Sequence, residues 1–313
     1  MTYEELTGKV IAEVEKTVIG KRDVVEKVFC AILAKGHILI EDIPGLGKTT
    51  MAMAFSQSMG LDVARVQFTP DVLPSDITGF TLYDQETKEM VFKPGPIFCN
   101  LFLADEINRT SPKSQSALLE VMEEGRVTID GEGHELDKPF TVIATQNPSG
   151  SAGTQLLPES QLDRFMVRLS VGYPAGNDEI RILKSKKQEG IKTERVLSKS
   201  RLLQMQEIVD KVFIHDMIYK YIVTLIQATR DNENLELGAS PRGGISLCKM
   251  ASAYAFIQGR DYVIPSDVEH VFVDVVSHRI ILTPAARMKH LSKEDVLKDI
   301  LNVVPKPKIV AAK

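Results

Sequence analysis

Residues 41–50 of the chain are EDIPGLGKTT, a stretch that comes close to the phosphate-binding loop pattern G-x-x-x-x-G-K-[ST]. Counting back from Lys48 and Thr49 places the first glycine of that pattern at position 42, where this chain has an aspartate. Three interpretations are open: a working nucleotide site that tolerates one change, a decayed site, or a chance occurrence of GKT. The sequence around the loop has to distinguish them.

The composition is that of an ordinary globular protein. With 313 residues, 43% of them hydrophobic and 26% charged, the chain is long enough for about two domains. The formal net charge of −4 gives no global electrostatic reason to expect nucleic-acid binding. Cys30, Cys99 and Cys248 are widely spaced and form no C-x-x-C, which fits three buried thiols in a reducing compartment better than a disulfide or zinc site. Without a signal-peptide or membrane-spanning apolar run, we expect a cytoplasmic protein with no membrane insertion.

Strands and helices alternate around the loop. A short apolar run at 37–40 predicts a buried strand leading into it, and the segment that follows predicts a helix closed by Gly60. Further predicted elements are strands at 63–68, 100–106, 140–147 and 167–174, a helix at 111–125, and two N-terminal helices within 1–36 that break at Ile19–Gly20. This alternation implies an α/β fold with a mainly parallel sheet covered by helices on both faces.

The pattern changes after Tyr173–Pro174. Residues 175–190 are polar and predict a linker, and from Leu197 to Leu282 nearly everything has helical periodicity. We therefore expect a nucleotide-binding core at 1–174, a linker at 175–190, and an all-helical second domain at 191–313 that ends in a short tail.

The loop has the groups that a phosphate site needs. Gly45 and Gly47 let backbone N–H groups approach phosphates at a helix N-terminus, where the macrodipole favours negative charge. Lys48 would reach the β- and γ-phosphates, and the Thr49 hydroxyl would bind Mg²⁺. The alternative is a glycine-rich turn before a helix, but the strand before it and the helix after it favour the nucleotide site.

Polar side chains follow two other predicted strands. Asp105 would orient Mg²⁺ through water, and Glu106 would polarise the attacking water as a general base. Asn147 would emerge on the same sheet edge, where its amide could bond both that water and the γ-phosphate. Taken singly, the acidic pair could be a solvated strand end and Asn147 a turn residue before proline.

Two arginines complete the set. Arg164 lies on a short helix before the last strand, and Arg242 lies at a helix start in the second domain. Arginine neutralises phosphoryl charge that develops during transfer, often from a neighbouring subunit. Each alone would more often be a surface salt-bridge residue.

The ordered motifs GLGKT, LFLADE, ATQN, LDRF and SPRG together resemble the AAA+ ATPase family. The segments DVLPSDITGF (71–80), LADEINRTSPKSQSALLEVMEEGRVTIDG (103–131) and LLPESQLDRF (156–165) resemble the MoxR group of that family, and the similarity runs from about residue 10 to about residue 285. This resemblance implies a parallel sheet of strand order 5-1-4-3-2, a helical lid, assembly into a ring for which we expect a hexamer, and hydrolysis of ATP with Mg²⁺.

The resemblance also implies roles for individual residues. Asp105 and Glu106 become the Walker B carboxylates, and Asn147 becomes sensor 1. Arg164 becomes the arginine finger presented to the next subunit and Arg242 becomes sensor 2, acting either on its own nucleotide or on a neighbour's. Arg109 and Arg168 are second choices for a trans-acting role. The nucleotide-binding residues are those of the loop and of the segment that packs on adenine: Ile19, Gly20, Pro44, Gly45, Leu46, Gly47, Lys48, Thr49 and Thr50.

Two insertions precede the Asn147 strand. Residues 71–96 contain FTLYD and MVFKPG around the polar turn QETKE, and residues 126–137 contain the turn signal Asp130–Gly131, so both predict β-hairpins. By resemblance they are the helix-2 insert and the pre-sensor-1 hairpin, which face the pore of the ring and move with nucleotide state. The alternative is that both are decorative loops.

The resemblance favours a chaperone-like remodeller or maturation factor that acts on a client protein, with a von Willebrand A domain protein as client or adaptor. A DNA-directed motor is one alternative, but the acidic balance and the acidic hairpin turns QETKE and DGEGHE argue against nucleic-acid binding. A nucleotide-gated scaffold with negligible turnover is another, against which Glu106 and Asn147 argue.

Asp42 remains to be explained. A carboxylate facing phosphate would be repelled, so we expect this side chain to point away from the nucleotide and to cap nearby backbone N–H groups. With the downstream motifs all present, a decayed site is disfavoured.

Overall fold

The computed structural model describes residues 2–42, 45–147, 157–185 and 193–307. Two helices open the chain, α1 (Tyr3–Glu15) and α2 (Arg22–Leu33). Thr2 caps α1, accepting a hydrogen bond from the Glu5 amide while the Glu5 side chain accepts one from the Thr2 amide. The helices separate where predicted, at Gly20, whose φ of 73° suits glycine.

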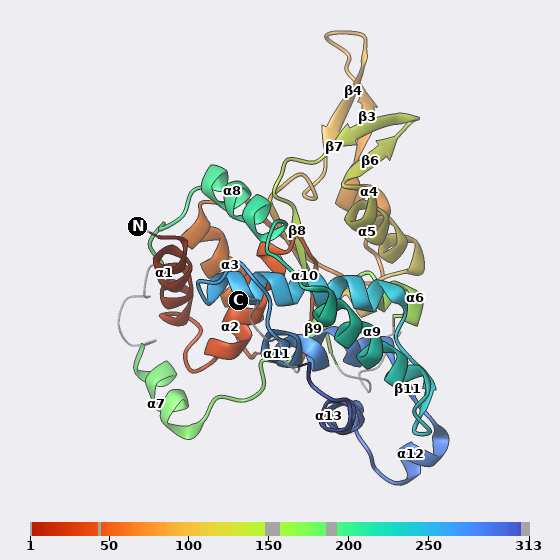
Figure 1. The fold of residues 1–313 in the computed structure, drawn as a ribbon. Coiled ribbons are helices and arrows are strands. Elements are labelled where there is room, and N and C mark those ends of the chain that lie inside the picture. The colour runs from red at the N-terminus through yellow and green to blue at the C-terminus, as the bar shows by residue number, and fades with distance from the viewer. Residues whose placement is uncertain (1, 43–44, 148–156, 186–192, 308–313) are drawn as a thin grey trace.

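A five-stranded parallel sheet forms the centre of the molecule (Figure 1). Its strands are β1 (Ile38–Glu41), β2 (Val63–Gln67), β5 (Leu101–Asp105), β8 (Thr141–Gln146) and β9 (Val167–Leu169). They lie in the order β2-β5-β8-β1-β9, which confirms the predicted order 5-1-4-3-2 when these five strands alone are counted along the chain. The phosphate loop therefore leaves the sheet between the strands that end at Gln146 and Leu169.

The sheet is covered on both faces, as predicted. Successive residues of a strand point to opposite faces, and in β5 Leu101 and Leu103 join one hydrophobic core while Phe102 and Ala104 join the other. The first core contains α1, α2, α3 (Lys48–Met59) and helices of the C-terminal half; the second contains α5 (Pro112–Glu124). All five residues of β5 are buried, which explains its continuous apolar run.

The helices of the core begin and end at the residues that the sequence indicated. Gly60 closes α3 in the left-handed conformation, with φ 58°. Ser111 caps α5, and Gly125 closes it with φ 67°. Shorter helices join these elements: α4 (Pro74–Thr78), the 3-10 turn η1 (Ile107–Arg109) and α6 (Glu159–Leu162).

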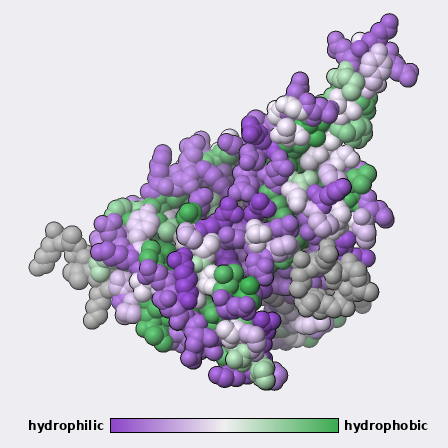
Figure 2. Space-filling model, turned by 90° about the vertical axis from the view of Figure 1, so that its right-hand side faces the viewer, coloured by the Kyte–Doolittle hydropathy of each residue, from purple (hydrophilic) through white to green (hydrophobic). Residues whose placement is uncertain are grey.

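Both predicted hairpins are present. One pairs β3 (Gly79–Tyr83) with β4 (Met90–Pro94), and the other pairs β6 (Arg126–Ile129) with β7 (Glu132–Glu135). They stand side by side above α5 (Figure 1), and the Phe92 ring stacks on His134 with centroids 3.9 Å apart. In Figure 2 the β3–β4 hairpin projects from the body as an arm with a hydrophilic tip.

The second half of the chain departs from the sequence prediction in two places. The predicted linker contains an amphipathic helix, α7 (Gly176–Ser185). The predicted all-helical domain is helical except for a two-stranded antiparallel sheet of β10 (Leu235–Leu237) and β11 (Ile281–Leu282), strands too short to show periodicity. Its helices are α8 (Lys199–Val209), α9 (Asp216–Arg230), α10 (Pro241–Ile257), α11 (Pro265–Val276), η2 (Ser277–Arg279), α12 (Pro284–Met288) and α13 (Lys293–Val303).

The three cysteines are free thiols. Cys30 and Cys99 are buried as predicted, but Cys248 is only partly buried. Burial raises the pKa of the Cys99 thiol to about 12 and that of Cys248 to about 11, so both remain protonated at neutral pH. Within the described ranges, no helix is both long and apolar enough to cross a membrane.

Candidate functional site

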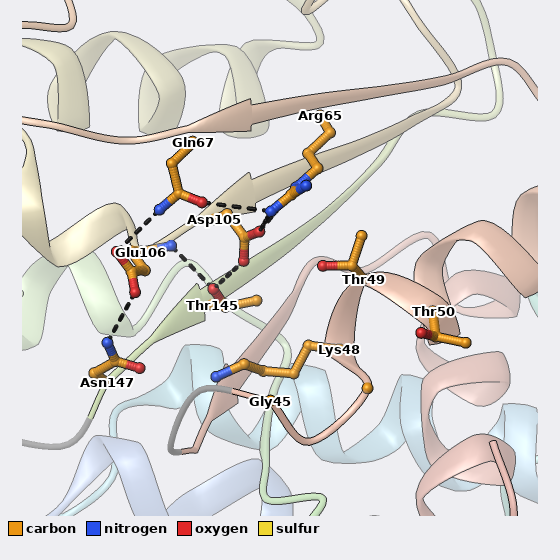
Figure 3. Close-up of a pocket in the computed structure, with 11 residues that line it drawn as sticks. Gly45, Lys48, Thr49, Thr50, Arg65, Gln67, Asp105, Glu106, Thr145 and Asn147 are labelled. Carbon is orange, nitrogen blue, oxygen red and sulfur yellow. Dashed lines mark hydrogen bonds and ion pairs between the residues drawn. The ribbon is translucent and has the colours of Figure 1, made fainter. Parts of the chain in front are cut away.

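A cavity of about 350 Å³ lies at the carboxyl edge of the parallel sheet (Figure 3). This is where ligands bind in open α/β sheets. Its walls come from the loop after β1, the first turn of α3 and the ends of β2, β5 and β8. The lining residues are Gly45, Gly47, Lys48, Thr49, Thr50, Arg65, Gln67, Asp105, Glu106, Thr145 and Asn147.

The glycine loop forms the wall at the start of α3. Gly45 and Gly47 have φ of 90° and 82°, and a Cβ at either position would meet no other atom within 4 Å. Backbone conformation, not lack of space, therefore demands glycine here. Helix α3 begins at Lys48, so the N–H groups of its first turn lie at this cavity. Leu46 is half-buried and packs against the core, and Pro44 lies outside the described residues.

Lys48 is anchored to the main chain of its own loop. Its buried ammonium donates to the Asp42 carbonyl oxygen over 2.7 Å. Burial lowers the pKa of Lys48, an effect opposed by the negative charges of Asp42, Asp105 and Glu106. A cation thus stands between the loop and the acidic strand ends.

The Asp42 carboxylate does not line the cavity. It is buried, and it accepts hydrogen bonds from the Ser170 hydroxyl at 3.0 Å, from the Val171 amide, and from the Gly172 amide at 3.4 Å. This confirms the expectation that the Asp42 side chain caps nearby backbone N–H groups. Asp42, which replaces the expected glycine of the loop pattern, therefore links the start of the loop to the segment that follows β9.

One hydroxyl orders both acidic residues. Thr145 Oγ1 donates to Asp105 Oδ1 at 2.8 Å and accepts from the Glu106 amide at 2.9 Å. On the other side of Asp105, Arg65 binds Oδ2 through Nε at 2.9 Å and Nη2 at 2.7 Å. Glu106 itself adopts the left-handed conformation with φ 57°, so the backbone turns sharply after β5.

Three donors surround the Glu106 carboxylate (Figure 3 shows the two from Gln67 and Asn147). Asn147 Nδ2 donates to Oε1 at 3.0 Å, while Gln67 Nε2 and Arg109 Nη1 donate to Oε2 at 2.9 and 2.7 Å. The structure therefore brings Glu106 and Asn147 together across neighbouring strands, as the sequence suggested. The three contacts fix the direction of a carboxylate that faces the cavity.

Arg65, Gln67 and Thr145 also line the cavity but were not predicted from the sequence. Arg65 and Gln67 lie two residues apart on β2, and so point to the same side near the carboxyl end of the strand. Thr145 lies one residue beyond Ala144, which pairs with Ala104 just before Asp105. Polar residues at the carboxyl ends of parallel strands were the signal that could have found them.

The other predicted residues lie away from the cavity. Ile19 is buried. Gly20 packs closely against α7, because a Cβ at this position would come within 2.2 Å of Asp178 Oδ2. Arg164 and Arg242 both contact Glu123 of α5, at 3.0 and 2.7 Å. Neither arginine lines the cavity of its own chain.

The second-choice arginines are engaged inside the chain. Arg109 pairs with Glu106 at 2.7 Å. Arg168 forms two ion pairs, each at 2.9 Å, with Glu41 at the end of β1 and with Glu294 of α13. Only 19% of the Arg168 side chain is exposed. This placement argues against a trans-acting role for Arg168. In this structure its side chain instead forms ion pairs that link the sheet to the C-terminal helix α13.

Comparison with known proteins agrees with this geometry. Residues 37–167 match the model of an ATPase family associated with various cellular activities (AAA), and residues 227–300 match an AAA lid domain. The chain is 47% identical to YeaC, an uncharacterized protein of Bacillus subtilis, over 98% of each chain. It is 39% identical to Chaperone MoxR1 of Mycobacterium tuberculosis, over 97% of this chain and 83% of that protein.

A solved structure is similar over nearly the whole length. A candidate ATPase from Cytophaga hutchinsonii superposes with a TM-score of 0.91 at 38% identity, covering 98% of this chain and 96% of that one. The core and the helical lid are both included in that match. Similarity of this extent, together with the relatives named MoxR, establishes kinship and not merely a shared fold. The chain therefore belongs to the MoxR family of AAA+ ATPases.

Proposed function

We propose that this protein hydrolyses ATP to ADP and phosphate, with Mg²⁺ as cofactor. The observation that most supports this is the placement of Glu106 on the same cavity as the glycine loop, with its carboxylate directed by Asn147 and Gln67. A carboxylate so held can accept a proton from a water that attacks phosphorus. Family membership supports the same activity.

The phosphate groups would lie against the loop. Gly45 and Gly47 leave the backbone open toward the cavity, and the buried Lys48 lines it. When phosphates enter, we expect the Lys48 ammonium to exchange the Asp42 carbonyl for a phosphate oxygen, because a charged acceptor binds more strongly than a neutral one.

The residues present fit a magnesium ion. Thr49 and Asp105 line one cavity and offer the oxygen ligands that Mg²⁺ prefers, Asp105 acting through water. Bound there, the ion would neutralise charge on the phosphate oxygens. The chain's own contribution is to hold Asp105 in place through Thr145 and Arg65.

We infer that the active form is a ring, which we expect to be a hexamer. Arg164 and Arg242 are partly exposed, and neither lines the cavity of its own chain. A trans-acting role on the nucleotide of the next subunit accounts for both, and it requires adjacent copies to meet at this face.

Hydrolysis would drive remodelling of a client protein. The supporting observation is the arm of β3 and β4, which exposes Phe80, Tyr83, Met90 and Val91 below its polar turn. Such residues suit transient contact with apolar segments of another protein. MoxR1, a relative, is named a chaperone. We expect a cytoplasmic protein whose client or adaptor has a von Willebrand A domain, and we expect no nucleic acid to be involved.

The test is turnover of the wild type against Glu106→Gln. Loss of the general base should lower ATP turnover by about a hundredfold or more, with nucleotide affinity largely kept because the glycine loop and Lys48 are untouched. Fluorescent-nucleotide binding measures the affinity, and Glu120→Gln, an exposed residue of α5, is the control. Equal turnover in wild type and Glu106→Gln would exclude Glu106 as the base. Stimulation of turnover by DNA would favour a motor that acts on nucleic acid.

A further inference from the structure

The Glu123 carboxylate receives two arginines from different parts of the chain. Arg164 follows α6 in the core and donates from Nε to Oε2 at 3.0 Å. Arg242, in the first turn of α10, donates from Nη2 to Oε1 at 2.7 Å. The hydrogen bond from Arg164 is the largest effect and lowers the pKa of Glu123; burial opposes it, and the charge of Arg242 lowers the pKa further. Each carboxylate oxygen thus has its own guanidinium.

This cluster contributes little to holding the fold together. The side chains of Arg164, Arg242 and Glu123 are 32%, 46% and 44% exposed, and exposed ion pairs add little to stability. A different arginine, Arg279, is buried and links the helical domain to the core. Arg279 is 2% exposed; it donates to Asp163 Oδ1 at 2.7 Å and to the Phe165 carbonyl oxygen at 2.7 Å.

The same buried network sets the spacing of the two exposed arginines. Asp163 directly precedes Arg164, and its other oxygen accepts from the Ser240 hydroxyl at 3.1 Å. Ser240 is the residue before α10, two positions ahead of Arg242. Through Asp163, therefore, the backbones that present Arg164 and Arg242 are tied to each other, whatever the two guanidinium groups bind.

Two guanidinium groups that meet on one carboxylate can also meet on one phosphate. Both anions offer oxygens at similar separations, and arginine binds either through paired N–H donors. A phosphate with more charge and more acceptor oxygens than a carboxylate would compete well for the pair. The partial exposure of all three side chains leaves such an exchange open to a group arriving from outside the chain.

We propose that Glu123 is an internal substitute for phosphate, which holds Arg164 and Arg242 as one unit in the separate subunit and yields them to the nucleotide of an adjacent copy. This rests on the proposed ATPase function and deepens it. It assigns Arg242 to the neighbouring subunit's nucleotide together with Arg164, and it makes Glu123 a restraint that assembly must overcome.

The restraint predicts the behaviour of Glu123→Gln, which keeps the shape of the side chain and removes its charge. We measure ATP turnover per subunit as a function of protein concentration. Without the competing carboxylate, the half-activation concentration should fall by about three- to tenfold, the range expected for losing one or two exposed ion pairs. Glu124→Gln is the matched control, because the adjacent Glu124 pairs only with Arg126, at 3.4 Å, among the ion pairs of the described residues.

Two results would overturn the proposal. One is a half-activation concentration equal to that of wild type and Glu124→Gln; the other is reduced turnover of Glu123→Gln at every concentration, which would make Glu123 a residue that supports the active state. Glu123→Asp, which retains the charge, should lie nearer to wild type than Glu123→Gln does. Thermal unfolding of the variants checks that each is folded.

A second measurement separates this proposal from the function on which it rests. Sedimentation with ATP in the Glu106→Gln background reports assembly without turnover, and adding Glu123→Gln should lower the concentration for half-assembly. If the wild type hydrolyses no ATP yet this shift occurs, the ATPase proposal fails and the restraint stands. If turnover is normal and neither concentration shifts, the restraint fails alone.

Discussion

The Thr145 hydroxyl donates a 2.8 Å hydrogen bond to Asp105 Oδ1 while accepting one from the Glu106 amide. A single side chain on β8 thereby contacts both the last residue of the neighbouring strand, Asp105, and the residue that follows it, Glu106. Parallel pairing of β5 and β8 makes this possible, because it places Thr145 beside the end of β5. The arrangement joins the proposed metal-orienting residue to the proposed base.

Thr145→Val should therefore damage catalysis more than binding. Losing the hydroxyl frees one oxygen of Asp105 and leaves the Glu106 amide without its acceptor, so we expect ATP turnover to fall by about ten- to a hundredfold. Nucleotide affinity depends mainly on the glycine loop, so it should change by a smaller factor than turnover does. Steady-state turnover and fluorescent-nucleotide binding measure the two effects separately.

Thr141→Val is the control for that prediction. Thr141 lies on the same strand and is 2% exposed, and its hydroxyl has no hydrogen-bond partner among the described residues. Replacing a buried hydroxyl that has no partner in the described part of the chain should leave turnover unchanged and should not reduce stability. A similar loss of turnover in both variants would mean that the strand, not the Thr145 hydroxyl, is what matters.

Asp42→Ala should destabilise the protein. The substitution leaves the buried Val171 amide and the Ser170 hydroxyl without their acceptor, at a cost of about 1–3 kcal/mol in the free energy of unfolding. Urea unfolding measures it, with the exposed Asp71→Ala as control. Stability equal to wild type would show that the departure from the glycine pattern is neutral and not a structural fastening.

His37 should make stability depend on pH. Its Nδ1 accepts from the Val142 amide and its Nε2 donates to the Met122 carbonyl oxygen, both at 3.0 Å, which fixes the neutral ring. Burial lowers the pKa of His37 from 6.5 to about 4. Because the folded pKa is the lower one, the unfolded chain binds more protons between these values, and stability is lost as pH falls from about 6.5 toward 4.

The contribution of His37 amounts to about 3 kcal/mol across that window. Urea unfolding between pH 4.5 and pH 7 should therefore show a shallower pH dependence in His37→Gln than in wild type. His290→Gln, at an exposed position, should retain the wild-type slope. Parallel slopes in all three proteins would contradict the assignment, and would point instead to other groups such as the buried His278, whose pKa burial also lowers.

The sequence predicted most of the sheet but only part of the site. The strand order was implied by the family resemblance, and the two hairpins were predicted from turn signals between short strand patterns. The helix in the predicted linker was missed because α7 is polar overall, with apolar residues on only one side. Arg65 and Gln67 were missed because single polar residues on an edge strand carry no motif.

By itself the sequence determined the local chemistry: a loop that only glycine can form at Gly45 and Gly47, and strand ends that carry Asp105, Glu106 and Asn147. These are properties of a few consecutive residues and the periods around them. Tertiary structure alone decided which groups share a hydrogen bond. Strand register placed Thr145 between two acids, and docking of α10 against the core set Arg242 beside Arg164 on Glu123. Contacts between residues so far apart in the chain depend on packing, which no local pattern encodes.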